Sequence, residues 1–298
     1  MQLSGSITAL ATPFTAAGEP DFEAWSRLID HQLEAGTAGI VVAGSTGEAA
    51  ALTDAEYMAL LRAAVAQVAG RIPVLAGTGH SNTAKTITQT RLARDGGADI
   101  ALVVTPPYVR PTPEGLVAHY RAVADQGGLP VVLYNVPGRT GCDMSPGVVA
   151  QLCSHDNIIG LKEARGDEER WQALYPLGGK DFALLSGDDP TFVRAVLGGA
   201  AGVISVASHV VGDRMQQMVS LAGAGDLDGE FIHRGGYSQF PVLAPRWSPI
   251  GSDAYSKGPG HDALPDVKTL IGLHWLQRWR AGTRPLAWLS AAQAAGVP

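Results

Sequence analysis

The sequence predicts an α/β protein in which residues 1–225 form a (β/α)8 TIM barrel and residues 226–298 form a C-terminal helical extension. Three observations predict the barrel. Eight short apolar runs recur at intervals of roughly 20 to 35 residues. Each run is rich in Val, Ile and Leu without alternation, which is typical of strands buried on both faces of a parallel sheet. The stretches between the runs have helical periodicity.

The elements follow one another in the order of a repeated strand–helix unit. Trp25, Leu28 and Ile29 recur at helical spacing after the first run, and Thr53 with Glu56 predicts a capping box at the next helix. The stretch GTGHSN at 77–82 lacks the third glycine of a dinucleotide-binding loop, which favours a barrel over a doubly wound sheet. The predicted strands lie at 7–14, 39–44, 73–79, 100–106, 130–135, 158–164, 182–187 and 202–207.

The repeated pattern ends after about residue 228. Residues 229–262 are dense in Gly, Pro, Ser and His without a clear period, whereas 265–279 and 286–295 again have helical periodicity. We therefore expect a helical extension that is atypical at 230–262. Two hypotheses stay open for that stretch: a divergent segment, or a segment translated from a shifted reading frame.

Composition narrows the class of protein. The chain of 298 residues has a formal net charge of −6, which argues against the basic surface of a nucleic-acid-binding protein. No apolar run approaches the roughly 20 residues of a membrane span, and the N-terminus lacks the basic region of a signal peptide. Two cysteines are too few for a disulfide framework. We expect a cytoplasmic protein with neither nucleic acid nor membrane as a partner.

Two candidate catalytic residues lie at the ends of neighbouring predicted strands, where barrel active sites are built. Lys162 stands inside an apolar run, where burial would favour the neutral amine that attacks a carbonyl carbon. The alternative is a lysine that reaches solvent or pairs with Glu163. Tyr134 ends the preceding run, where its hydroxyl is suited to moving a proton, and the alternative is an ordinary packed tyrosine.

Two more strand ends carry groups suited to a carboxylate ligand. Ser45 and Thr46 lie in GSTGE at 44–48, where hydroxyls and backbone amides are suited to an anion; the alternative is a plain strand–helix turn. Arg139 follows a Pro-Gly turn and is suited to bidentate binding, unless it is a solvated loop residue. We expect no metal and no organic cofactor, because HExxH, CxxC, Walker and GxSxG motifs are absent. His209 follows the eighth run; of its two interpretations, a residue that reaches the barrel mouth and a solvated loop residue, the second is expected.

Five motifs stand in register at the predicted strand ends: GSTGE, YNVPGRTG, GLKEA, SGDD and GVISVAS. With them, the chain resembles the dihydrodipicolinate synthase (4-hydroxy-tetrahydrodipicolinate synthase) family. That family belongs to the superfamily of pyruvate-dependent class I aldolases and N-acetylneuraminate lyase. The similarity extends from about Ser4 to about Gly229.

The resemblance implies four catalytic roles. Lys162 matches the lysine that forms a Schiff base with pyruvate, and Tyr134 matches the tyrosine that donates and accepts protons. Thr46 matches the threonine that joins this tyrosine to a proton relay. Tyr108 matches the tyrosine that completes the relay from a neighbouring subunit of a tight dimer.

The resemblance also implies the substrate contacts. Ser45 and Thr46 match hydroxyl residues of the pyruvate site, although many members carry threonine where Ser45 stands. Gly187 and Ile204 match residues that line the pyruvate pocket, and Arg139 matches the arginine that binds the carboxylate of L-aspartate 4-semialdehyde.

The implied activity is a lyase-class condensation of pyruvate with L-aspartate 4-semialdehyde, in diaminopimelate and lysine biosynthesis. The implied assembly is a homotetramer built as a dimer of dimers. The resemblance implies no cofactor, and the substrate pyruvate is bound covalently to Lys162 as a Schiff base. Two alternatives stay open. One is another pyruvate Schiff-base lyase, acting on N-acetylneuraminate or sugar acids, and the other is a catalytically inactive paralogue that serves as a binding protein.

Many members of the family are inhibited by lysine at a site in the tight-dimer interface. The positions that match this site carry less suitable groups: Ala49, Asp54, Tyr57, Ser81 and Lys85. A lysine ligand would be repelled by the cationic Lys85. We therefore predict weak or absent inhibition by lysine.

Overall fold

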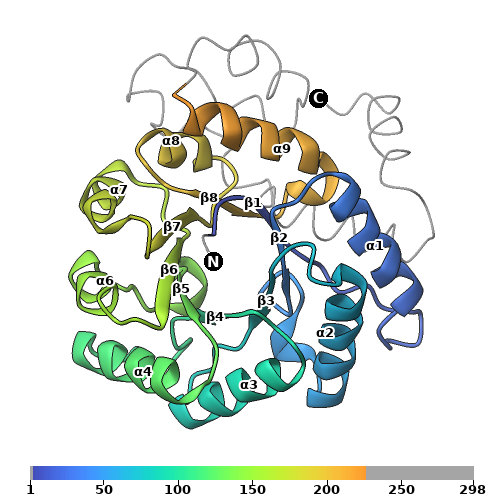
Figure 1. Ribbon diagram of the computed structural model, residues 1–298. Coiled ribbons are helices and arrows are strands. Elements are labelled where there is room, and N and C mark those ends of the chain that lie inside the picture. The colour runs from blue at the N-terminus through green and yellow to red at the C-terminus, as the bar shows by residue number, and fades with distance from the viewer. Residues whose placement is uncertain (1–2, 226–298) are drawn as a thin grey trace, which may run out of the picture. The chain divides into compact units, whose positions relative to one another are not determined.

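The computed structural model describes residues 3–225, which form a closed barrel of eight parallel strands in the order β1 to β8. Each strand pairs with the next, and β8 pairs with β1 to close the ring (Figure 1). The predicted TIM barrel is thus confirmed. The strands are β1 (Gly5–Ala9), β2 (Gly39–Val42), β3 (Val74–Gly77), β4 (Ile100–Val104), β5 (Val131–Asn135), β6 (Ile158–Glu163), β7 (Ala183–Ser186) and β8 (Gly202–Ser205).

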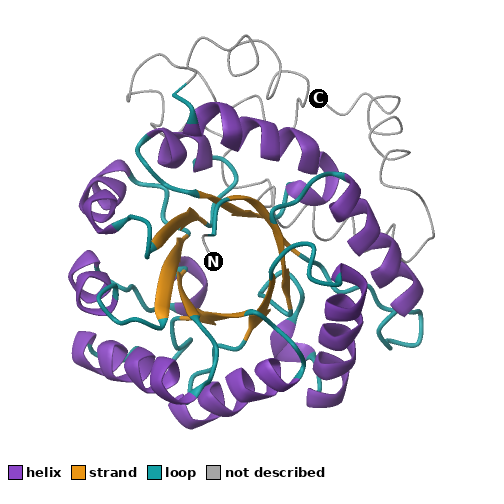
Figure 2. Cartoon of the chain, in the orientation of Figure 1, coloured by secondary structure: helices purple, strands orange, loops and turns teal. Residues whose placement is uncertain are grey.

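Helices surround the ring of strands, as Figure 2 shows. The described helices are α1 (Phe22–Glu34), α2 (Asp54–Val68), α3 (Thr83–Asp95), α4 (Pro113–Gln126), α5 (Pro137–Thr140), α6 (Pro146–Leu152), α7 (Glu168–Leu174), α8 (Phe192–Leu197) and α9 (Ser208–Gly223), with short 3-10 turns η1 (Ala49–Ala51) and η2 (Tyr175–Leu177). The predicted C-terminal helical extension at 226–298, including its atypical stretch at 230–262, lies outside the described residues.

The first strand differs from its prediction. The run at 7–14 was expected to be the strand, whereas β1 begins at Gly5 and ends at Ala9. Leu10 still donates a backbone hydrogen bond to the carbonyl of Val41, but the ladder does not continue to Pro13, which has no N–H to donate. The apolar residues after Ala9 instead form the loop that leads to α1.

Side-chain caps define where most of the helices begin. The predicted capping box at α2 is confirmed: Thr53 accepts from the backbone of Glu56, and Glu56 accepts from the backbone of Thr53. Each such cap satisfies N–H groups that have no partner inside the helix and contributes about 1 kcal/mol. The other capping side chains are Asp21, Asn82, Thr112, Ser145 and Asp167.

The barrel interior is filled by buried side chains from β1 to β5, β7 and β8, and the partly buried Ile159 of β6 packs against them. Ile7, Leu75 and Leu185 are among the residues of this cluster, and Tyr134 and Ile204 belong to it as well. Because successive side chains of a strand point to opposite faces, the same strands send their alternate residues outward against the helices. The interior packing therefore positions Tyr134 at one end of the barrel.

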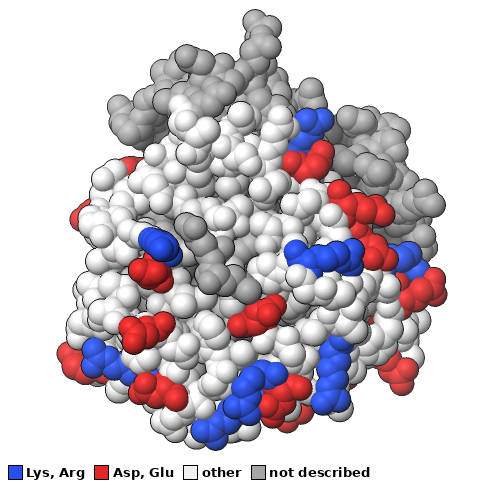
Figure 3. Space-filling view, viewed as in Figure 1, with Lys and Arg blue, Asp and Glu red and all other residues white. Residues whose placement is uncertain are grey.

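Charged side chains are mixed on the face that Figure 3 shows, with basic and acidic groups side by side and no large area of one sign. Among residues 3–225, no helix is long and apolar enough to cross a membrane.

Candidate active site

Lys162 and Tyr134 lie side by side at the carboxyl ends of β6 and β5. The two residues are directly paired in the register of these strands. Lys162 is 6% exposed and Tyr134 is 7% exposed. The Lys162 Nζ lies 4.4 Å from the centroid of the Tyr134 ring, within range of a favourable amine–aromatic contact. The expected proximity of these two residues is confirmed, and Lys162 does not extend into solvent.

Gly187 packs against the side chain of Lys162. A β-carbon at Gly187 would lie 2.9 Å from the Lys162 Cε and 3.1 Å from its Cγ. The Gly187 N–H donates a 2.7 Å hydrogen bond to the carbonyl of Glu163, which fixes this approach. Ile204 belongs to the same interior cluster as Tyr134. Ile204 is therefore part of the barrel interior, and Gly187 lies against the Lys162 side chain.

The GSTGE loop follows β2 at the same end of the barrel. Ser45 is exposed and Thr46 is half-buried. The loop leaves the strand through Ala43, whose φ of 50° lies in the left-handed region. Such strained residues persist only where their surroundings hold them, and here the Ala43 carbonyl packs against Gly77 so closely that a β-carbon there would lie 2.0 Å from it. This backbone geometry sets the direction in which the GSTGE loop leaves β2.

Tyr108 and Arg139 lie on two adjoining loops, after β4 and after β5. Tyr108 has a φ of 73° and is 93% exposed, an unusual state for a large aromatic residue. Its backbone N–H donates a 3.0 Å hydrogen bond to the carbonyl of Thr140, next to Arg139 in the single turn of α5. Arg139 is exposed, as its candidate role in binding a carboxylate requires.

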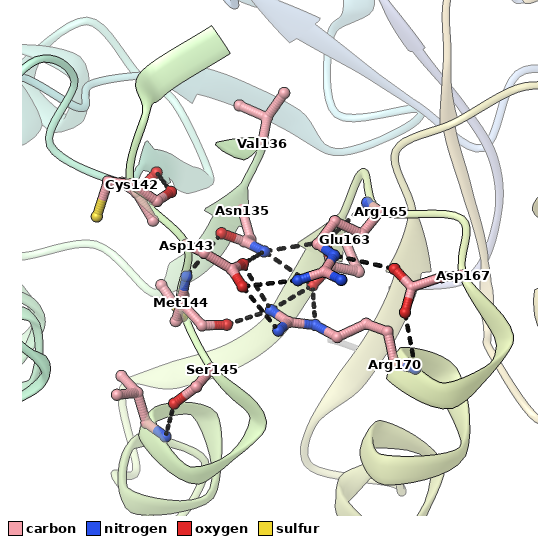
Figure 4. A network of polar contacts seen from close by, with 12 residues as sticks. Asn135, Val136, Cys142, Asp143, Met144, Ser145, Glu163, Arg165, Asp167 and Arg170 are labelled. Carbon is pink, nitrogen blue, oxygen red and sulfur yellow. Dashed lines mark hydrogen bonds and ion pairs between the residues drawn. The ribbon is translucent and has the colours of Figure 1, made fainter. Parts of the chain in front are cut away.

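A polar network lies at the ends of β5 and β6, centred on the buried Asn135 and Glu163 (Figure 4). Because side chains alternate along a strand, these two residues face away from Tyr134 and Lys162. Asn135 and Glu163, the next residues along each strand, are paired across it. The Asn135 Nδ2 donates to both oxygens of Glu163, at 3.1 and 3.0 Å. The guanidinium of Arg170, on α7, donates to Glu163 from Nε at 2.9 Å. Glu163 thus pairs with Arg170 rather than with Lys162.

His209 does not lie in a solvated loop, so that expectation was wrong. The residue is buried in α9, where its Nε2 accepts a 3.0 Å hydrogen bond from the backbone of Ala11, and its Nδ1 lies 2.8 Å from the carbonyl of Val206. An acceptor Nε2 and a donor Nδ1 define a neutral ring. Burial lowers the pKa of His209 to about 4. His209 therefore joins the β1 loop to the start of α9.

Other hydrogen bonds between a side chain and the backbone also join the loops at this end of the barrel. Asp189 accepts hydrogen bonds from the backbones of Val206 and Ala207, which links the loops after β7 and β8. The hydroxyl of Thr12 donates to the carbonyl of Gly47, which links the loops after β1 and β2. These links hold the candidate residues in place.

The structure therefore places Tyr134 and Gly187 each against the side chain of Lys162. Ser45, Thr46 and Tyr108 lie on the loops after β2 and β4, and Arg139 lies in the one-turn helix α5 after β5. Asn135 had no predicted role, and Glu163 was considered only as an alternative partner of Lys162. Their signal was present, because a polar residue follows directly after Tyr134 and after Lys162 in otherwise apolar strands.

Comparisons with known proteins agree with this arrangement. The profile of the Dihydrodipicolinate synthetase family matches residues 2–234. The chain is 56% identical over 277 residues to the 4-hydroxy-tetrahydrodipicolinate synthase of Stenotrophomonas maltophilia strain R551-3, covering 92% of this chain and 93% of the relative. It is 64% identical over 226 residues to that of strain K279a, covering 76% of each. A profile of a bacteriophage head to tail connecting protein matches only residues 214–276, a short part of the chain.

The fold of this chain is also similar to that of a solved structure of the family. The chloride-inhibited dihydrodipicolinate synthase of Acinetobacter baumannii, crystallised with pyruvate, has a TM-score of 0.76 and 38% sequence identity. The match covers 83% of this chain and 85% of that one. By its sequence, its fold and its strand-end motifs, the chain belongs to the dihydrodipicolinate synthetase family.

Proposed function

We propose that this chain condenses pyruvate with L-aspartate 4-semialdehyde through a Schiff base on Lys162. The activity is that of its curated relatives, which are 4-hydroxy-tetrahydrodipicolinate synthases at 56% and 64% identity. The chain is accordingly a lyase of lysine biosynthesis. One observation carries the assignment of the site: a buried lysine amine lies against a buried tyrosine at the carboxyl ends of adjacent barrel strands.

The burial of Lys162 supports the first step. Desolvation disfavours an ammonium ion, and the neutral amine is the form that attacks the ketone carbon of pyruvate. Loss of water from the adduct gives an iminium, which withdraws electrons from the adjacent methyl group. A methyl proton can then leave, and the resulting enamine carbon attacks the aldehyde of the second substrate. The amine of that substrate finally displaces Lys162 and closes the ring.

Tyr134 is the group best placed to move protons during these steps. Its ring lies beside the Lys162 amine, so that its hydroxyl shares the space in which the adduct forms and loses water. Thr46 would join Tyr134 to the relay and, with Ser45, would bind the pyruvate carboxylate through hydroxyl and amide donors. Gly187 and Ile204 would border the methyl group.

Arg139 would bind the carboxylate of the second substrate. Its exposed position on the one-turn helix α5 suits a ligand that arrives from solvent after pyruvate is bound. A cation here favours L-aspartate 4-semialdehyde over an uncharged aldose, which separates a synthase from the sugar-acid and N-acetylneuraminate lyases of the superfamily.

Tyr108 would act in the site of a neighbouring subunit. Its ring is almost fully exposed and is held on a left-handed backbone turn, which suits a residue that projects into a partner. A homotetramer built as a dimer of dimers would supply that partner. We also infer that residues 1–225 form the catalytic domain, with residues 226–298 as an extension.

Borohydride trapping tests the Schiff base. The protein is incubated with pyruvate and sodium borohydride, digested and analysed by mass spectrometry. The peptide that contains Lys162 should gain the mass of pyruvate less water plus two hydrogens. Lys162→Met should give no adduct, whereas Lys180→Met, at an exposed lysine, should react like the parent protein. A parent protein that gives no adduct would remove the aldolase class and leave the inactive paralogue.

A coupled assay tests the second substrate. L-Aspartate 4-semialdehyde and N-acetylmannosamine are compared as acceptors for pyruvate, with the parent protein and with Arg139→Ala. Turnover of the semialdehyde alone, with a KM for it that rises at least tenfold in Arg139→Ala, supports the synthase. Equal turnover of the sugar would favour the alternative lyase.

A further inference from the structure

The polar network next to the candidate site contains an ion pair between Glu163 and Arg170, and burying this pair costs free energy. Glu163 is fully buried, and the side chain of Arg170 is 4% exposed. A buried ion pair loses the hydration of both groups, and an apolar pair of similar volume often gives equal or greater stability. Stability alone is therefore a weak reason for an ion pair at this place, one residue beyond the proposed Schiff-base lysine.

The network connects five segments at the ends of β5 and β6. Arg170 donates to the carbonyl of Met144, and the Asn135 Oδ1 accepts a 2.9 Å bond from the Met144 N–H. The backbone of Arg165 donates to Glu163 Oε1 at 2.8 Å. Asp143 accepts from the Asn135 side chain at 2.9 Å and from the Arg165 Nη1 at 2.8 Å. Both strand ends are thus fixed to the loops that follow them.

The outer clamp, in which Asn135 and Arg170 hold Glu163, is directly next to the inner pair of Tyr134 and Lys162. Tyr134 is paired with Lys162 and Asn135 with Glu163, so the two pairs are consecutive rungs of one ladder. A change in the spacing or twist of the outer rung would be transmitted to the inner one, because side chains of adjacent residues share the same backbone. The Lys162 amine would then move relative to the Tyr134 hydroxyl.

The ionised form of Glu163 fits its surroundings. Burial raises the pKa of Glu163 above its ordinary value, while the charge of Arg170 and the hydrogen bonds from Arg165, Asn135 and Arg170 act in the opposite direction. The described neighbours present donors to both oxygens, which suits a carboxylate. The other charged groups of the network are Asp143, Arg165, Asp167 and Arg170, so it carries three acidic and two basic groups.

We infer that Glu163 is a positioning residue for Lys162: its carboxylate, clamped by Asn135 and Arg170, holds the amine against Tyr134, and its negative charge helps set the pH at which the amine reacts. The inference rests on the proposed function, because it concerns the same lysine. It goes further in assigning a role to a residue that faces away from the substrate.

Glutamine is an informative replacement. Glu163→Gln keeps the shape but removes the charge, and it places an NH2 group where one oxygen now accepts hydrogen bonds. We expect kcat to fall about 100-fold, as for other small displacements of a reacting group. Loss of the negative charge should also move the pH of half-maximal borohydride trapping about one unit lower, because the ammonium form loses a stabilising neighbour.

Matched variants separate positioning from a general loss of stability. Glu163→Asp keeps the charge and should keep the parent pH profile with a smaller loss of kcat. The double variant E163Q/R170M removes one charge of each sign and should return the pH profile to that of the parent, with kcat still low. Gln32→Met removes another buried polar contact, between Gln32 on α1 and Thr8 on β1. This variant should be less stable than the parent protein but should keep its kcat and pH profile.

The outcomes are distinct. A folded Glu163→Gln protein with the parent kcat and pH profile overturns the inference while the proposed function stands. A parent protein that traps no pyruvate overturns both. If Glu163→Gln does not fold, the double variant decides: low kcat with the parent pH profile supports the inference, and the parent kcat overturns it.

Discussion

Gly187 leaves room for Lys162: a β-carbon on Gly187 would lie 2.9 Å from the Lys162 Cε, too close for an unperturbed lysine. The contact is between the end of β7 and a side chain of β6, two strands that are hydrogen-bonded to each other. A glycine at this place therefore has a direct effect on the position of the proposed nucleophile.

Gly187→Ala should reduce activity much more than stability. The lysine side chain can swing away from the new methyl group at little cost to folding, but its amine then leaves Tyr134. We expect kcat to fall about 100-fold and the free energy of unfolding to change by less than about 1 kcal/mol. Gly179→Ala is the control, because no atom lies within 4 Å of a β-carbon there. Equal activity of the two variants in the coupled assay would contradict this account.

Tyr108→Phe tests the relay between subunits. Removal of the hydroxyl should lower kcat about 100-fold, while sedimentation velocity should show an unchanged assembly. Val109→Ala, at the exposed neighbouring residue, should retain the parent kcat. A mixture of Tyr108→Phe and Lys162→Met protomers, refolded together, should regain activity, because each hybrid dimer contains one site with an intact Lys162 and a partner's intact Tyr108. No regain would mean that Tyr108 acts within its own subunit.

Two buried histidines predict a loss of stability in acid. Burial lowers the pKa of His119 and of His209 to about 4 in the folded chain, whereas an unfolded histidine titrates near 6.5. Between these values the unfolded chain binds protons that the folded chain does not, so stability should fall as the pH drops from about 6.5 to 4. Each histidine accounts for about 3 kcal/mol at most.

Urea denaturation between pH 7.5 and pH 4 measures this effect. In His209→Gln, the glutamine oxygen can still accept from the Ala11 N–H but does not titrate, so the decline with acid should become shallower. His80→Gln is the control, at an exposed histidine, and should follow the parent curve. A His209→Gln curve parallel to that of the parent protein would be inconsistent with the role assigned to His209.

Lysine should inhibit the enzyme weakly or not at all. Of the positions that match the inhibitory site of the family, Lys85 is exposed near the start of α3 and carries a positive charge, which opposes a cationic ligand. Lys85→Ala should therefore increase any sensitivity to lysine in a steady-state assay. Half-inhibition of the parent protein by submillimolar lysine would show the prediction to be wrong.

Much of the fold could be predicted because the information is local. The eight apolar runs gave all eight strands, and seven of them began within one residue of the predicted start. The first strand instead began two residues before its predicted start, at Gly5, and ended at Ala9, ahead of Pro13 and the loop that leads to α1. The capping box at Thr53 was visible because its two partners are three residues apart. The pairing of Lys162 with Tyr134 followed from the order of the strands.

Contacts between distant parts of the chain could not be predicted in this way. His209 meets Ala11 across 198 positions, so its burial depends on closure of the barrel between β8 and β1. Arg170 meets Asp143, 27 positions before it, because α7 packs beside the ends of β5 and β6. Periodicity contains no information about such partners.

The sequence by itself determined the number and order of the strands, the family, and the identity of the residues proposed for chemistry. It could do so because periodicity, caps and motifs depend on neighbours within a few positions. The tertiary structure decided how those residues are held: Gly187 against the Lys162 stem, Glu163 between Asn135 and Arg170, and Tyr108 exposed on a left-handed turn. These relations require the pairing of β4 to β7 and the packing of α7 beside them, because only then do these separate segments share the space that fixes their side chains.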